Sequence, residues 1–565
     1  MKKRIFASAL AAVMVLSLCA CGGNAASGAA ASTESADSAA PEETKAAQEV
    51  TTPAETASTE EASTEAPTAQ YDAIEYPIEG DHSFTMTSVK RMNVAEALGD
   101  KDYSATISYE ALEKATGVHI DFEMLAETSY EETLNLRMAS QDYPDIFSQS
   151  VASYQQKLEK AIDEDILIDF NDYLEYAPDW ANLLERNETY RENITNSDGS
   201  IAQIVNCTLG KSTQQGLIRG DWLKELGMDT PTTIDEMTDV LRAFKDKYGT
   251  TNALLINSDL DSAAEFGFNF SAQGFKMLSF QLTEPGSNEV VAGVATEAYV
   301  EYLEYLHSLY EEGLITDDFV STSKENGNWE SSFYSGACGV WQDDCKYADS
   351  SYAAMADDPN WDAVPFAFTG EDYHMVSVNP VGLTTTYVST TCEEPEIAVE
   401  FLNYGFTEDG RKLVNYGVEG ETYTVDDNGD IAFTDLMLKN PDGYTFDQAQ
   451  VLYLVANWMP TEQDDSYLKI NYTDDAIEAI NLWSSTGDST MTIPQAAQPG
   501  GDDMMEIFTM ASDSLTYLST VAPKVILGTA TADDYRNAVQ ECMNGMNLDV
   551  ITEKYQAAYD EFMGN

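Results

Sequence analysis

The feature that most constrains this chain is an abrupt change of composition at residue 70. Between Gly22 and Gln70 the sequence has no aromatic residue, no Leu and no Ile. Such a segment cannot bury enough apolar surface to offset the entropy of ordering it. Nine acidic residues stand there against Lys45 alone, so charge repulsion extends it further. We therefore expect residues 21–70 to be a disordered acidic linker and residues 71–565 to form the folded part.

The residues before the linker have the pattern of a secretory signal peptide. Three basic residues at positions 2–4 precede an apolar run from Ile5 to Leu18, and small residues follow it. A basic head, a short apolar body and a small-residue end are typical of such signals. The run is shorter than the ~20 apolar residues that a membrane-spanning helix needs. We expect residues 1–20 to be removed.

The two cysteines at the end of this run differ in their surroundings. The sequence Leu18-Cys19-Ala20-Cys21 resembles the bacterial lipoprotein cleavage signal, which has Leu three positions before the modified Cys and a small residue directly before it. Cys21 meets both conditions, whereas Cys19 directly follows the large Leu18. We therefore expect lipidation at Cys21. Several acyl chains on one residue anchor a protein stably to a membrane.

Charge and residue counts exclude several classes of function. The formal net charge is −69, which argues against nucleic acid as a partner, because such partners need basic patches. Five cysteines follow Cys21 and only four histidines are present, with no spacing typical of zinc sites, so no zinc site is expected. No metal site or cofactor is assigned, and a structural calcium ion stays open in so acidic a chain. The 31 Tyr, 21 Phe and 7 Trp suffice for a large core, and the length predicts two or more lobes.

The first part of the folded region predicts a mostly parallel sheet. Residues 83–89 alternate apolar and polar side chains, as in a strand. A helix is expected to end near Gly117, and a strand to begin at Val118. Residues 143–147 read as another short apolar strand. Strands that alternate with helices are typical of a sheet with crossover helices.

Later segments give clear local signals. After Pro231, Thr233 and Glu236 predict a capping box at the start of a helix. Residues 426–430 contain Asn-Gly between two β-rich stretches, which predicts a hairpin turn. The final segment, 533–562, reads as helical. Apolar stripes predict one buried face on each of two helices, with Gly313 ending the second; these stripes are Met237, Val240, Leu241 and Phe244, and Tyr299, Leu303, Leu306 and Tyr310.

Several of these segments resemble, in order, one family: the carbohydrate-type extracellular solute-binding proteins of bacterial ABC importers. The resemblance covers roughly residues 80–565. Two departures lie near the expected ligand site: Ala337-Cys338 replaces the usual Lys-containing turn after Gly336, and strand 83–89 lacks the aromatic residue that often follows it. The matching segments are YPDIF (143–147), IRGDWLKELGMDTPTTIDEMTDVLRAFK (218–245), YLEYLHSLYEEGLI (302–315), FYSGACGV (333–340), the stretch 395–430 and the closing stretch 525–562.

The resemblance implies an α/β, two-lobed periplasmic-binding-protein-like fold of type II. Each lobe would be a mixed β-sheet flanked by helices, with extra C-terminal helices, and the ligand would bind in the cleft between the lobes. We expect lobe 1 at about 71–214 and 350–405, and lobe 2 at about 215–349 with part of 406–565. The implied partners are a solute, most simply an oligosaccharide, and the permease subunits of an ABC importer. The protein is expected as a monomer, lipid-anchored at the extracellular face of the cell membrane.

Candidate ligand-binding residues are aromatic and polar side chains near the expected cleft. Aromatic faces pack on the apolar side of a sugar ring, and Asp, Asn and Arg make charge-assisted hydrogen bonds to its hydroxyls. The segment 340–347 offers the densest group. The candidates are Trp341, Asp343, Asp344, Arg219, Tyr143, Trp329, Asn379 and Trp458.

Two other functions remain open from the sequence. A secreted surface enzyme acting on glycans would need two carboxylates a few ångströms apart, and a chain with 98 acidic residues offers too many such pairs to be informative. The sequence has no nucleophile elbow, no HExxH and no phosphate-binding loop, so no enzymatic activity is expected. A ligand-sensing partner of a membrane receptor would use the same fold, because a fold alone does not fix function.

Overall fold

The computed structural model divides the chain into two units, Met1–Ala66 and Pro67–Asn565, and describes parts of the second. Along these residues, no helix is both long and apolar enough to cross a membrane. The expected signal peptide, lipidation site and linker lie outside them. The described residues are 71–90, 98–99, 101–126, 129–130, 133, 136–137, 140–148, 158–257, 260, 264–270, 279–322, 328–348, 356, 358–369, 375–376, 380–488, 491–494 and 497–564.

The first sheet has five strands in the order β2-β1-β3-β11-β4. β1 pairs in parallel with β2 and β3, whereas β11 is antiparallel to β3 and β4, so the sheet is mixed. The alternating residues 83–89 lie within β1, which confirms that prediction. The strands are β1 (His82–Lys90), β2 (Val118–Ala126), β3 (Ile146–Ser148), β4 (Ile204–Cys207) and β11 (Val381–Val388).

The crossover between β1 and β2 contains α2 (Ile107–Thr116), whose ends are fixed by local chemistry. The Thr106 side chain accepts a hydrogen bond from the Tyr109 amide at the start of the helix. Gly117 follows the last turn with a φ of +76°, a left-handed conformation that glycine adopts without steric cost. The helix therefore ends where the sequence predicts, and β2 begins at the next residue.

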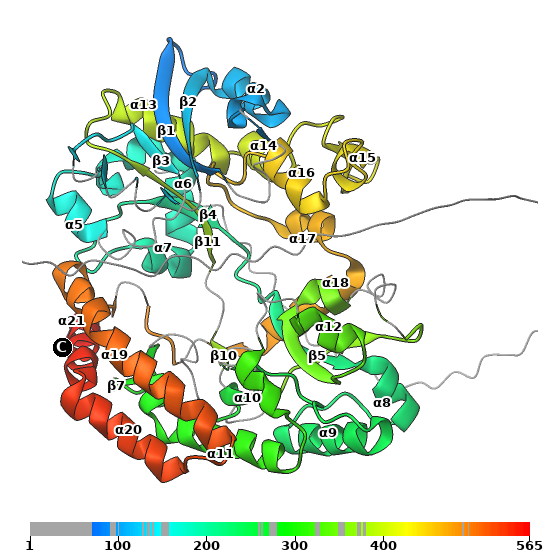
Figure 1. Ribbon diagram of the computed structural model, residues 1–565. Helices are drawn as coiled ribbons and strands as arrows, with labels where there is room; N and C mark the ends of the chain where they lie inside the picture. Colours follow the sequence, from blue (N-terminus) through cyan, green and yellow to red (C-terminus); the bar gives the residue numbers. More distant parts are fainter. Residues whose placement is uncertain are drawn as a thin grey trace, which may run out of the picture. The chain divides into compact units, whose positions relative to one another are not determined.

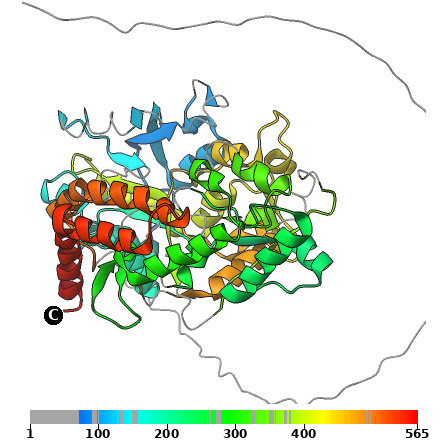
Figure 2. The same cartoon turned by 60° about the horizontal axis from the view of Figure 1, so that its bottom comes forward.

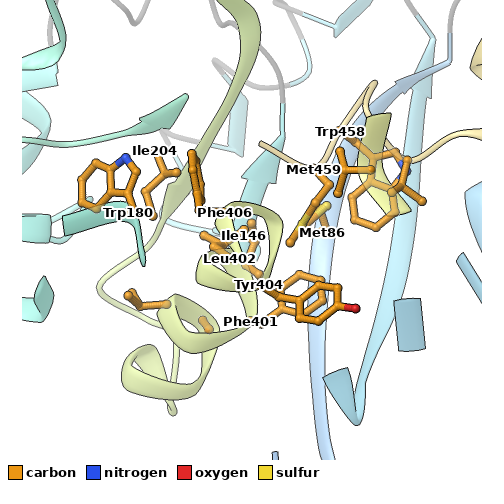
Figure 3. Packing of buried hydrophobic residues seen from close by; sticks show 14 of the residues in the cluster. Met86, Ile146, Trp180, Ile204, Phe401, Leu402, Tyr404, Phe406, Trp458 and Met459 are labelled. Atoms are coloured by element: carbon orange, nitrogen blue, oxygen red, sulfur yellow. The ribbon is translucent and has the colours of Figure 1, made fainter. Parts of the chain in front are cut away.

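Helices and one late loop close an apolar core on this sheet. Figure 3 shows Met86 and Ile146 of the sheet in one cluster with Leu402, and Trp458 and Met459 beside Met86. Burial of these side chains supplies the main favourable free energy of folding. The helices around this sheet are α6 (Pro178–Arg186), α7 (Glu188–Ile194), α13 (Pro395–Asn403), α14 (Glu408–Tyr416) and α16 (Phe446–Tyr453).

The second sheet has three strands in the order β8-β5-β9, with each neighbouring pair antiparallel. Its strands are β5 (Gln214–Arg219), β8 (Val340–Asp344) and β9 (Ala363–Pro365). Helices α8 (Gly220–Leu226), α9 (Ile234–Tyr248), α11 (Glu297–Glu311) and α12 (Asn328–Tyr334) belong to the same part of the chain.

The two amphipathic helices of this part form as the sequence predicts. At the start of α9, Thr233 and Glu236 form both hydrogen bonds of a capping box. The predicted stripe of α9 is buried throughout. On α11 the first three residues of the predicted face are buried and Tyr310 is half-buried. Gly313, at a φ of +66°, lies two residues beyond the end of α11.

The C-terminal helices pack against α11. Figures 1 and 2 both show α19 (Gly501–Ile526) and α20 (Ala532–Gly545) running side by side. The ring of Tyr535 stacks on Tyr299 of α11 at 5.6 Å, and its hydroxyl donates a hydrogen bond to the Val294 carbonyl at 3.0 Å. Together with α21 (Leu548–Phe562), these helices confirm the predicted helical tail and extend the core of the second sheet.

We call the two packed bodies the first lobe, around the five-stranded sheet, and the second lobe, around the three-stranded sheet. Strand β9 pairs with β5, and Phe366 and Phe368 are buried in the core of the second lobe, so the return to the first lobe comes after Phe368 rather than near residue 350 as expected. That pairing joins residues far apart in sequence and leaves no mark in composition. Along the described residues the chain passes between the lobes three times: along 208–213, between Thr369 and Val381, and along 460–467, which we call the crossing segments.

A small hairpin stands on the first lobe. Strands β12 (Tyr423–Val425) and β13 (Ile431–Phe433) are antiparallel, and Gly429 turns the chain with a φ of +90°, which confirms the predicted turn. The remaining described elements are α5 (Leu158–Asp163), α10 (Ala264–Phe268), α15 (Asp435–Leu438), α17 (Asp465–Asn471), α18 (Asp474–Ser485), β6 (Phe280–Leu282), β7 (Val290–Ala292), β10 (Met375–Val376) and β14 (Gly487–Asp488).

The capping box of α9 gives a testable prediction. We expect Thr233→Ala to destabilise the first turn by about 1 kcal/mol, because it removes the acceptor for the Glu236 amide. Amide hydrogen exchange at the start of α9 should become about five-fold faster. Thr230→Ala is the control, since Thr230 is exposed and precedes the cap. Equal exchange in both variants would contradict the role of the box.

Candidate functional site

Strand ends of both sheets meet the crossing segments. β1, β2, β3 and β4 share one direction, so their carboxyl ends lie at one edge of the first sheet. Cys207 at the end of β4 leads directly into the crossing segment 208–213. In the second sheet, β5 enters at Gln214, and β8 ends opposite it at Asp344. We call these two edges the crossing edges. In open α/β sheets, ligands bind outside the carboxyl ends of strands where the chain order reverses.

A row of hydroxyl side chains lies beside the crossing edge of the first sheet. Thr386 of β11 is paired with Ser148 of β3, and Ser88 of β1 follows Thr87, the partner of Phe147. The three hydroxyl residues of this row are fully buried. Ser148 donates a hydrogen bond to the Trp458 carbonyl at 3.2 Å. The hydroxyls of Ser88 and Thr386 have no hydrogen-bond partner within the described part of the chain.

Trp458 lies just before the third crossing segment and is also fully buried. Its ring packs edge-on against Phe122 at 4.9 Å and lies 6.2 Å from the ring of Tyr109. Its indole Nε1 has no hydrogen-bond partner among the described residues. A buried donor without a partner costs about 1–3 kcal/mol. The nitrogen is closed to solvent, so in this structure Trp458 lies in the core of the first lobe and not on a ligand-binding surface.

Tyr130 contacts the same row from the other side of β3. Its hydroxyl donates a hydrogen bond to the Ser148 carbonyl at 3.0 Å. Burial raises the pKa of Tyr130 to about 12, so the phenol stays protonated at physiological pH. The first lobe therefore brings neutral hydrogen-bonding groups together near its crossing edge, and all of them are buried in its interior.

The second lobe places four of the candidate residues near its crossing edge. Asp343 and Asp344 end β8 there. Trp341 is 1% exposed and stacks on Phe333 at 4.7 Å, so it packs in the core. Trp329 is equally buried and donates a hydrogen bond from Nε1 to Asp343 at 2.6 Å. Asp344 is half-buried and accepts the Lys346 amide at 3.0 Å. Contact of these four residues with a ligand stays a prediction.

Arg219 lies at the opposite end of β5 from the crossing edge. A strand rises about 3.3 Å per residue, so Arg219 stands roughly 17 Å along β5 from Gln214. Its guanidinium forms two hydrogen bonds to Asp221, at 2.7 and 2.6 Å, and lies 4.4 Å from the ring centre of Trp222. The side chain is 1% exposed. The topology thus separates Arg219 from the other candidates.

Of the remaining candidates, only Tyr143 lies among the described residues. Tyr143 is half-buried before the amino end of β3 and packs on the cluster that contains Phe147. Asn379 and the lipidation site Cys21 lie outside the described residues, so both stay predictions. Residues Ser88 and Thr386 did not stand out in the sequence, because single hydroxyls in a strand are common. Neither residue had a sequence signal that pointed to a site, and strand pairing was needed to bring them into one row.

Comparison with known proteins places the chain in a wider context. The family model described as "Bacterial extracellular solute-binding protein" matches residues 95–412. Lipoprotein LipO of Bacillus subtilis is 26% identical over 348 residues, 59% of this chain and 66% of that protein. The fructooligosaccharide ABC transporter substrate-binding protein FusA of Streptococcus pneumoniae is 28% identical over 263 residues, 44% of this chain and 48% of that protein. The matched part is therefore less than two thirds of either relative.

Solved structures share the fold over most of the chain. An extracellular solute-binding protein from Bifidobacterium longum subsp. infantis matches with a TM-score of 0.69 at 17% identity, covering 86% of this chain and 99% of that one. The alginate-binding protein AlgQ2 matches with a TM-score of 0.63 at 21% identity over the same shares. At such identity the likeness shows the fold, which is the expected two-lobed type II periplasmic-binding-protein-like fold.

The carboxylates at the end of β8 give a testable prediction. We expect Asp343→Asn to lower stability by about 1–3 kcal/mol, because both carboxylate oxygens accept N–H donors and an amide supplies only one acceptor. Asp344→Asn is the matched control, since one oxygen of Asp344 accepts both of its hydrogen bonds and the amide retains that oxygen. Thermal unfolding measures both. A melting temperature that falls more in the control would contradict this account.

Proposed function

The chain belongs to the bacterial extracellular solute-binding protein family, and on that premise we propose that it captures an oligosaccharide between its two lobes and delivers it to the permease subunits of an ABC importer. The observation that carries the proposal is the arrangement of strand ends at the two crossing edges, joined by three crossing segments. A ligand held there contacts both lobes, so its binding energy can draw them together.

Two considerations support an oligosaccharide as the solute. The relatives with curated names include one that takes fructooligosaccharides and a Bacillus subtilis protein described as binding polygalacturonan and rhamnogalacturonan. At the second crossing edge, the half-buried Asp344 has a carboxylate oxygen that no described contact occupies. A sugar hydroxyl can donate a charge-assisted hydrogen bond to such an oxygen.

The contacting residues are proposed from their place at the crossing edges. Asp344 is half-buried at the second sheet's edge and retains an unoccupied carboxylate oxygen in the described contacts. Trp458 borders the third crossing segment. Trp341, Trp329 and Asp343 support the same edge from within the core. Tyr143 remains a proposed contact. Asn379, which lies outside the described residues, is also a proposed contact.

The family consists of binding proteins, and we propose that this chain likewise has no catalytic activity. The alternatives, a secreted enzyme acting on glycans and a sensing partner of a receptor, draw no support from the relatives found. The solute-binding protein acts at the outer face of the membrane as a monomer, and lipid on Cys21 anchors it there. A lipoprotein relative supports the anchor. Tethering raises the effective concentration of the binding protein at its permease.

The solute class is tested by thermal unfolding with a ligand panel. We expect kestose, nystose or an oligogalacturonide to raise the melting temperature, because a ligand at 100 times its dissociation constant stabilises the native state by about 2.7 kcal/mol. Amino acids and dipeptides are the matched non-sugar ligands and should have no effect. Stabilisation by a dipeptide alone would overturn the oligosaccharide proposal, and hydrolysis of a chromogenic glycoside would favour an enzyme.

The anchor is tested at the two neighbouring cysteines. In a bacterial host, Cys21→Ser should abolish incorporation of labelled palmitate and release the protein from the membrane fraction, because Cys21 supplies the acylated thiol. Cys19→Ser is the control and should keep both the label and the membrane location. Label retained by Cys21→Ser but lost from Cys19→Ser would reassign the lipid to Cys19.

A further inference from the structure

We propose that Tyr472 is the aromatic ligand contact of the second crossing edge, where it and Asp344 hold one sugar unit of the captured oligosaccharide. This inference rests on the proposed function and adds a residue to the same site. Tyr472 directly follows α17, the helix that continues the third crossing segment. It therefore stands where that segment reaches the second lobe.

Helix α17 contacts both lobes and thereby fixes the place of Tyr472. Tyr467 and Ile470 pack on the apolar cluster of the hairpin that stands on the first lobe. Leu468, by contrast, is buried in the cluster of the second lobe that contains Trp341. Figure 1 shows α17 between α16 and α18. A residue at the end of such a helix is placed to contact a ligand that both lobes hold.

Two side-chain hydrogen bonds hold the ends of α17 on the first lobe. At its start, the Tyr416 hydroxyl donates to Asp464 at 2.9 Å. At its end, the Gln450 amide donates to the Asn471 side-chain oxygen at 2.7 Å. Tyr472 is the next residue, so its backbone is already ordered before a ligand arrives. Such preorganisation lowers the entropy cost of binding.

Tyr472 lies beside the end of β8. It packs on the cluster that contains Cys345 and Tyr347, which belong to the short turn directly after Asp344. Helix α18, which begins two residues after Tyr472, packs along the same turn. Burial raises the pKa of Tyr472, and the nearby Tyr467, Cys345 and Asp344 side chains raise it further. The phenol therefore stays protonated and can donate a hydrogen bond.

Both residues have polar atoms that a ligand can reach. Tyr472 is half-buried, and its hydroxyl makes no hydrogen bond with the described residues and is open to solvent. Asp344 is also half-buried, and its Oδ1 accepts both of its described hydrogen bonds, which leaves Oδ2. The indole nitrogens of Trp341 and Trp458, in contrast, are closed to solvent. Tyr472 is therefore an accessible aromatic side chain beside an accessible carboxylate.

A tyrosine beside a carboxylate matches the chemistry of a sugar. One sugar hydroxyl can donate a charge-assisted hydrogen bond to Asp344, and a neighbouring hydroxyl can accept one from Tyr472. The C–H groups of a sugar ring pack on aromatic surfaces. The two residues are 128 positions apart in the sequence, and the third crossing brings them together.

The test measures the dissociation constants of kestose, nystose and an oligogalacturonide by titration calorimetry on the full chain. We expect Tyr472→Phe to weaken binding of the oligosaccharide that stabilises wild type by about five-fold, because the change removes only the hydroxyl. Tyr310→Phe is the matched control. Tyr310 is also half-buried, its hydroxyl makes no described hydrogen bond, and it lies on α11 in the second lobe. This control should bind as wild type does.

Asp344→Asn separates binding from stability. It retains the oxygen that accepts both described hydrogen bonds, so the melting temperature of the ligand-free protein should stay that of wild type. The same oligosaccharide should bind about ten-fold more weakly, because a charged acceptor is lost. The double variant with Tyr472→Phe should lose less than the product of the two single losses, because both groups hold one sugar unit.

An unchanged dissociation constant in Tyr472→Phe overturns the proposal and leaves oligosaccharide capture intact. An equal loss in Tyr310→Phe also overturns it, because the effect would then not depend on the crossing edge. If none of the three oligosaccharides stabilises wild type, the proposed function fails, and the Tyr472 contact fails with it.

Discussion

The structure depends on how its crossing segments are held where they leave the first lobe. Cys207 and the segment around Thr461 exchange backbone hydrogen bonds, from the Cys207 amide to Thr461 at 2.9 Å and from the Gln463 amide to Cys207 at 2.8 Å. The Glu462 side chain is only 12% exposed and pairs with both Arg186 and Arg411. A carboxylate so far from water is stable only with such partners. Two crossings therefore leave the first sheet as one paired ribbon.

This ribbon determines what the two lobes can do. The ribbon begins at the carboxyl end of β4, and its segment 208–213 continues into β5. It therefore links the crossing edge of the first sheet directly to the crossing edge of the second sheet. The groups beside it are neutral donors and acceptors in the first lobe and the carboxylates of β8 in the second. The first-lobe groups are fully buried, whereas Asp344 is half-buried and can accept a hydrogen bond from a ligand hydroxyl.

Part of the fold was predictable because its causes are local. The capping box at Thr233, the left-handed glycine at 117 and the turn at Gly429 each depend on a few adjacent residues. The candidate site was predictable only in outline. Trp341 and Asp343 were found from residue type beside a strand end, but Trp341 packs on Phe333 within the core. Ser88 and Thr386 gave no signal, since their common row exists only through the pairing of three strands.

The sequence by itself predicted an export signal at residues 1–21 and an acidic linker up to residue 70. It determined the amphipathic helices and the order of the family's segments, because each depends on neighbouring residues. Only the tertiary structure decided where the lobes divide and which polar groups are left without partners. Strand β9 joins the second lobe through β5, and Arg219 meets Gly336 and Asp362 from segments more than a hundred residues away. Burial and hydrogen-bond satisfaction depend on such distant neighbours, and composition carries no record of them.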